Sequence, residues 1–153
     1  RSRGPLFIAG IVFLLVAVGA SLLLVFEHLG ALSLPGCGQG SPSAEAAASA
    51  WGRVPVLEWP TAFLGLAYFI AALAAWVASR GDPAGPFRLV VHLGAFISAG
   101  FLLVLIVKGY VCNYCLAAHL ANFAFLFVVE RVFLEQRILV FERIVFEQRT
   151  AVE

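Results

Sequence analysis

Charged side chains are scarce in this sequence, and their absence from four long segments excludes a soluble protein. Only 12% of the 153 residues are charged, whereas 62% are hydrophobic; soluble domains average about 45–50% apolar residues. The runs that contain no Asp, Glu, Lys or Arg are residues 5–26, 60–79, 89–107 and 109–129. Each run approaches the roughly 20 residues with which a helix crosses a bilayer. The sequence therefore predicts an all-α membrane protein, a four-helix bundle with spans at about 5–26, 60–79, 87–107 and 110–129.

Two further absences narrow the function. The net charge is only +1, and no basic patch with interleaved aromatic residues is present, so we expect no nucleic-acid partner. There is no second CxxC and no HxxxH pattern to complete the four ligands of a zinc site, so we expect no metal. The first apolar run is longer than the core of a signal peptide, so we interpret it as an uncleaved span.

The few basic residues are distributed unevenly between the two predicted sides. Eight arginines fall before the first span, between the second and third, or after the fourth, and two basic residues fall in the other two connections. Basic residues concentrate on the cytoplasmic side of membrane proteins. We therefore expect cytoplasmic termini, with the loop 27–59 and the turn at Lys108 on the exterior. All three cysteines then share the exterior side, where thiols can be oxidised.

Two segments outside the spans have a distinct composition. In the loop 27–59, a turn-rich stretch at 35–42 precedes an Ala-rich stretch at 43–51 that favours a short helix. Trp51 and Trp59 suit the headgroup region, so we expect this loop to cap the exterior end of the bundle. Residues 131–153 alternate apolar and charged clusters; they are predicted to continue the fourth helix or to lie in the membrane interface. This gives a four-helix membrane domain at 1–130 and a charged amphipathic tail at 131–153.

The motif with clear chemistry is Cys112-Asn113-Tyr114-Cys115, at the start of the fourth span. A CxxC pair at the boundary between water and lipid can exchange electrons with a protein thiol and with a lipid-soluble carrier. Cys37 is left over, and Ser43, six residues later, suggests that a serine replaces its partner cysteine. A polar residue inside a span is costly and usually functional. His119 is therefore a candidate either for contact with such a carrier or for a packed, hydrogen-bonded position, and Asn122 either lines the same pocket or forms a helix–helix hydrogen bond.

These motifs together resemble the vitamin K epoxide reductase family, including its bacterial homologues, over about residues 10–130. The resemblance is carried by Gly36-Cys37, the residue at position 43, Ser49 followed by Trp51-Gly52-Arg53, Thr61-Ala62-Phe63-Leu64-Gly65 at the start of a span, and the CxxC. It implies four helices around a quinone pocket capped by the exterior loop. It also implies a bacterial inner-membrane enzyme that forms disulfides by passing electrons from a thioredoxin-like partner to ubiquinone, menaquinone or vitamin K.

The resemblance also implies roles for individual residues. Cys37 and the residue at position 43 would relay electrons to Cys112, and Cys115 would react with the quinone. Ser49 would lie near the CxxC, and Thr61 and His119 occupy positions where the animal enzymes carry the asparagine and tyrosine of the quinone pocket. The aromatic residues that could form the walls for a flat ring are Phe63, Tyr68, Phe96, Phe101 and Phe123.

The sequence departs from the pattern of the family in three respects, and there are two alternatives to the proposed function. Ser43 should interrupt the relay, the missing asparagine and tyrosine argue against animal-type epoxide chemistry, and the lack of an appended thioredoxin-like domain implies a separate partner. An unrelated four-helix disulfide oxidase of bacterial membranes also uses quinone, but it carries its CxxC in the first exterior loop. A non-catalytic membrane scaffold or quinone binder is the other alternative.

Overall fold

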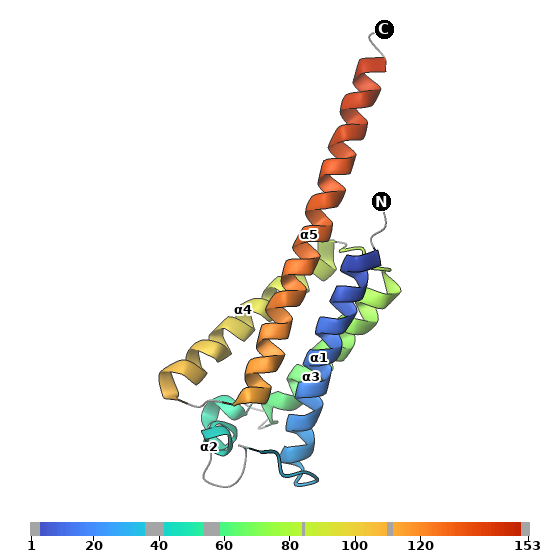
Figure 1. The fold of residues 1–153 in the computed structure, drawn as a ribbon. Coiled ribbons are helices and arrows are strands. Elements are labelled where there is room, and N and C mark those ends of the chain that lie inside the picture. Colours follow the sequence, from blue (N-terminus) through green and yellow to red (C-terminus); the bar gives the residue numbers. More distant parts are fainter. Residues whose placement is uncertain (1–3, 36–41, 54–58, 84, 110–111, 151–153) are drawn as a thin grey trace.

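The computed structural model of the chain describes residues 4–35, 42–53, 59–83, 85–109 and 112–150, and Figure 1 shows the arrangement of its elements. Within these residues there are helices and no strand. The elements are α1 (Gly4–His28), α2 (Pro42–Ala48), the 3₁₀ turn η1 (Ala50–Gly52), α3 (Thr61–Ala78), α4 (Gly85–Lys108) and α5 (Asn113–Thr150). Four of them, α1, α3, α4 and α5, are long and apolar enough to cross a membrane. The predicted all-α, four-span membrane protein is confirmed.

The four long helices are not packed equally. Helix α1 packs against both α3 and α5, and α4 packs mainly against α5. Figure 1 shows α4 close to α5 near Gly85 and splayed away from the other helices at its Lys108 end. The short α2 and η1 lie at that same end, where α1 finishes and α3 and α5 begin. We call this the loop end, and the opposite end, where α1 starts, the termini end.

Helix α5 is much longer than a membrane span. It covers 38 residues and continues past residue 130 without a break, well beyond the termini end of the other helices. No Gly or Pro interrupts this stretch of sequence, so nothing breaks the ladder of backbone hydrogen bonds. Of the two arrangements expected for the tail, the structure has the helix that continues from the fourth span. Its apolar side chains are exposed, among them Phe141 and Phe146.

The best-packed part of the core surrounds Trp76 on α3, near the termini end. This side chain is fully buried and contacts aromatic rings from three other helices: Phe7 and Phe87 at centroid distances of 6.3 and 6.2 Å, and Phe125 edge-on at 5.3 Å. Its indole Nε1–H donates to the backbone oxygen of Phe7 at 3.1 Å, so the buried polar atom is satisfied. Gly10 lets α1 approach the indole, because a Cβ there would lie 2.5 Å from Nε1.

The chain turns sharply after α3, next to the end of the span expected at 60–79. Helix α3 ends at Ala78, and Arg80 and Gly81 adopt positive φ values of 52° and 74°, a conformation that reverses the chain. The predicted short helix at 43–51 is present as two pieces, α2 and η1.

The contact between Gly10 and Trp76 can be tested by adding one methyl group. We expect Gly10→Ala to destabilise the protein by about 1–3 kcal/mol, since the new methyl overlaps a ring with no room to move. The change should appear as a lower midpoint of thermal unfolding in detergent micelles. Gly19→Ala is the matched control on the same helix, because nothing lies within 4 Å of its Cβ position. Equal midpoints for the two variants would contradict the packing described for Trp76.

Candidate functional site

The CxxC pair lies at the N-terminus of α5, at the loop end. Cys112 immediately precedes the helix and is buried, whereas Cys115 lies in the first turn and is half-buried. The backbone N–H of Cys115 donates to Cys112 Sγ at 3.3 Å, so the thiol caps the helix. The N-terminal dipole of the helix and this amide favour negative charge on the sulfur. The arrangement suits Cys112 for thiolate chemistry.

His119 and Asn122 follow on the same helix and form a polar row, partly buried at its two ends, with residues of neighbouring helices. Asn122 Nδ2 donates to Ser98 Oγ on α4 at 2.9 Å, and His119 Nδ1 lies 3.1 Å from the same oxygen. From α3, the hydroxyl of Tyr68 donates to Asn122 Oδ1 at 3.2 Å. Asn122 is 0% exposed and lies inside a span, where neither water nor lipid offers a hydrogen bond. Its amide therefore depends entirely on these partners. The row Tyr68–Asn122–Ser98–His119 thus links α3, α4 and α5.

An aromatic contact holds the ring of His119 on α5. The imidazole lies nearly parallel to the ring of Phe101 on α4, with centroids 5.8 Å apart and an interplanar angle of 13°. Phe96 on the same helix is 79% exposed and does not face the bundle, although the sequence made it a candidate for the wall of the pocket. Of the candidate aromatic residues, Tyr68 belongs to the polar row and Phe101 contacts it.

The two candidates on α3 contact the loop end instead. Thr61 Oγ1 donates to the backbone oxygen of Gly52 at 3.3 Å, which ties η1 to the start of α3. Phe63 packs edge-on against His28 of α1, with centroids 6.3 Å apart. Ser49 precedes η1, and its backbone N–H donates to the oxygen of Glu45 at 3.0 Å. These three residues belong to the cap and its attachment, whereas His119 and Asn122 lie deeper on α5.

The structure does not describe the side chains of the two predicted relay residues of the loop. Cys37 lies outside the described residues. Ser43 lies in α2, but its side chain is not among those described. Within the described part of the chain, no group of three His, Cys, Asp or Glu residues is arranged to hold a metal ion.

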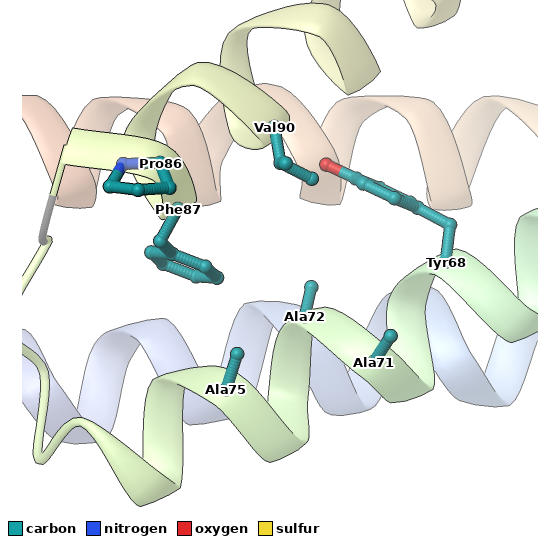
Figure 2. A pocket seen from close by; sticks show the side chains of 7 residues that line it. All are labelled: Tyr68, Ala71, Ala72, Ala75, Pro86, Phe87 and Val90. Atoms are coloured by element: carbon teal, nitrogen blue, oxygen red, sulfur yellow. The ribbon is translucent and has the colours of Figure 1, made fainter.

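An apolar cavity of about 270 Å³ lies between α3 and α4, on the termini side of the polar row. It is lined by Tyr68, Ala71, Ala72, Ala75, Pro86, Phe87 and Val90. Figure 2 shows the Tyr68 ring reaching from α3 across one end of this cavity toward Val90 on α4. Of the candidate residues named from the sequence, Tyr68 lines it, whereas neither cysteine of the CxxC does.

Sequence reasoning missed two groups of residues. Ser98 joins His119 to Asn122, and the signal for it was the presence of a hydroxyl in a charge-free span. Arg88 on α4 forms two 2.7 Å bonds with the carboxylate of Glu130 on α5, and His92 Nε2 lies 3.2 Å from the same carboxylate. This ion pair attaches α4 to α5 near the termini end, far along the helices from the cysteines.

The side chain of Tyr68 can extend past α4 to Asn122 because residue 94 is a glycine. A Cβ at position 94 would overlap the phenol. We expect Gly94→Ala to displace Tyr68, break its bond to Asn122 and destabilise the protein by about 1–3 kcal/mol, measured as the thermal midpoint in detergent. Gly100→Ala on the same helix is the control, since its Cβ position has no neighbour within 4 Å. A Gly94→Ala midpoint as high as that of the control would show that Tyr68 does not pack as described.

A comparison with protein families gives one match, to the family described as the vitamin K epoxide reductase family, over residues 8–129. The matched segment includes the CxxC and the whole polar row. Neither a curated protein nor a solved structure matches the chain.

Proposed function

Since the chain belongs to the vitamin K epoxide reductase family, a family of membrane oxidoreductases, we propose that it is a thiol–quinone oxidoreductase. The observation that carries this proposal is the position of Cys112 and Cys115 at the start of α5, inside the segment that matches the family. The sulfur of Cys112 accepts an amide hydrogen bond and benefits from the helix dipole, which suits it to leave and attack as a thiolate.

The first exchange takes electrons from a separate protein. A thioredoxin-like partner on the exterior side has a dithiol that is oxidised to a disulfide, and the Cys112–Cys115 disulfide is reduced to two thiols. In the complete relay, Cys37 and a cysteine at position 43 carry the electrons inward by thiol–disulfide exchange, and Cys112 receives them. With serine at position 43, this relay is interrupted.

The second exchange passes the electrons to quinone. Cys115 attacks as a thiolate, the Cys112–Cys115 disulfide forms again, and the quinone becomes a hydroquinone with two electrons and two protons. The two protons balance those of the two thiols. His119 lies four residues, about one helical turn, beyond Cys115 and contacts the quinone, while Asn122 supports it. Ubiquinone, menaquinone and vitamin K all carry the two carbonyls that this step requires.

The cap has a supporting role in this proposal. Thr61 fixes η1 to α3 through Gly52, and Phe63 packs against α1, so Ser49 and α2 are held over the loop end. A cap there limits the access of water to the CxxC, which favours charge transfer between the thiolate and an apolar quinone.

The distribution of basic residues supports an orientation in a bacterial inner membrane. Arg80 and Arg88 lie at the termini end, whereas Arg53 and Lys108 lie at the loop end. With the long tail, which carries four more arginines, the termini end is the cytoplasmic side. The CxxC then faces the periplasm, and residues 1–130 form the oxidoreductase domain with 131–153 as its cytoplasmic tail.

The proposed relay can be tested by restoring the cysteine. With reduced thioredoxin as donor and a short-chain menaquinone or ubiquinone as acceptor, we expect Ser43→Cys to raise the rate of quinone reduction by about tenfold or more, because thiol exchange needs a sulfur at this position. With dithiothreitol, which is small enough to reach Cys112–Cys115 directly, both forms should be active. The rate is read from the quinone absorbance.

Two controls make this test specific. Ser33→Cys adds a thiol to the same loop at another position and should give no gain with thioredoxin. Cys115→Ala should abolish quinone reduction with either donor. If the chain and its Ser43→Cys variant both fail to reduce quinone with dithiothreitol, the protein is not a thiol–quinone oxidoreductase.

A further inference from the structure

The polar row in the middle of the bundle has a defined order of donors and acceptors. The phenol O–H of Tyr68 donates to Asn122 Oδ1, and Asn122 Nδ2, which can only donate, gives its hydrogen to Ser98 Oγ. Ser98 then has its own hydroxyl proton to donate, and His119 Nδ1 lies 3.1 Å from that oxygen. When Ser98 donates to that nitrogen, His119 Nδ1 is the acceptor and the proton of the neutral imidazole is on Nε2.

The two central members of the row are buried, which favours this order of donors and acceptors. Ser98 and Asn122 are 4% and 0% exposed, and they lie inside spans where no solvent competes for their hydrogen bonds. The amide of Asn122 forms one hydrogen bond on each side, to α3 and to α4. Turning it over would place an oxygen beside Ser98 and a nitrogen beside Tyr68, which would require both hydroxyls to reverse as well.

The other nitrogen of His119 is accessible. Among the described residues, no buried side-chain nitrogen or oxygen lacks a partner, and none of the hydrogen bonds there involves Nε2 of His119. Nε2 is therefore not fully enclosed by the protein. The ring cannot turn freely, because Phe101 covers one face at 5.8 Å and Ser98 holds Nδ1. His119 thus presents an N–H donor in a fixed direction, about one helical turn from Cys115.

We propose that Tyr68, Asn122 and Ser98 are positioning residues that keep neutral His119 in the Nε2–H tautomer, so that it donates a hydrogen bond to a carbonyl oxygen of the quinone. This inference rests on the proposed function. As electrons leave the two thiols, the carbonyl oxygen gains negative charge, and a donor already in place stabilises that charge without reorganising. His119 keeps its proton, and the two protons of the hydroquinone come from the two thiols.

The tautomer can be measured without any activity. The full chain, labelled with ¹⁵N-histidine in detergent micelles, should show His119 with an unprotonated Nδ1 and a protonated Nε2; its signals are identified by their loss in His119→Gln. Ser98→Ala removes the donor to Nδ1 and should give a mixture of tautomers, and Ser98→Thr, which keeps the hydroxyl, should restore the single form. A proton on Nδ1 in the unmodified chain would overturn the inference.

Kinetics with dithiothreitol and short-chain menaquinone give the second readout. We expect Ser98→Ala to lower kcat about tenfold, as expected when an oriented donor is loosened rather than removed, and Ser98→Thr to recover most of the rate. Ser21→Ala, which removes an equally buried hydroxyl on α1, should keep kcat unchanged. Equal kcat values for Ser98→Ala and Ser21→Ala would refute the positioning role.

The two readouts separate this inference from the proposed function. If the unmodified chain reduces no quinone but His119 has the predicted tautomer, the proposed function fails and, with no carbonyl to receive the hydrogen bond, so does the positioning role. If quinone is reduced while the proton of His119 is on Nδ1, the thiol–quinone function stands and only the positioning role fails.

Discussion

A polar group inside a bilayer has to find its hydrogen-bond partner within the protein, because the hydrocarbon offers none. This constraint explains where α4 is attached. Near the middle of the bundle, Ser98 meets Asn122 and His119, and closer to the termini end Arg88 meets Glu130. Apolar helices gain little from packing against each other rather than against lipid. These two polar contacts therefore do much to fix the position and rotation of α4 against α5.

The two ends of the bundle differ as a result. At the termini end, Trp76 is enclosed by aromatic rings from three other helices, and the ion pair closes α4 onto α5. At the loop end, α4 diverges, and Ile106 and Val107 are more than two-thirds exposed. The polar row lies between the aromatic cluster and the end at which α4 diverges from the other helices. Its geometry is therefore set mainly from the termini side.

The sequence predicted the elements well, because hydropathy and chain-reversing residues act locally. The four spans and the short helix of the loop were readable from charge-free runs and turn residues, whereas the continuation of α5 was one of two arrangements expected for the tail. The contacts between elements were not readable. Tyr68 and Asn122 are separated by 54 residues, and their bond depends on how α3 and α5 are rotated about their own axes. Nothing in the local pattern fixes that rotation.

Thr61 illustrates the same limit within the candidate site. A threonine at the start of a span can direct its hydroxyl into the bundle or back to the preceding loop, and both are compatible with its neighbours in sequence. In the structure the hydroxyl donates to Gly52, so Thr61 fastens the cap. The sequence singled out His119 and Asn122 as polar residues inside a span, but it could not supply Ser98 as their common partner.

The uninterrupted course of α5 has a mechanical consequence. A straight helix of 38 residues measures roughly 57 Å, about twice the thickness of the hydrocarbon layer. Because the helix is continuous, it rigidly connects two distant regions: the exposed stretch that projects beyond the bundle and the turn that carries the sulfur atoms. For a rigid helix, a tilt at the far end would reorient the first turn, which carries Cys115.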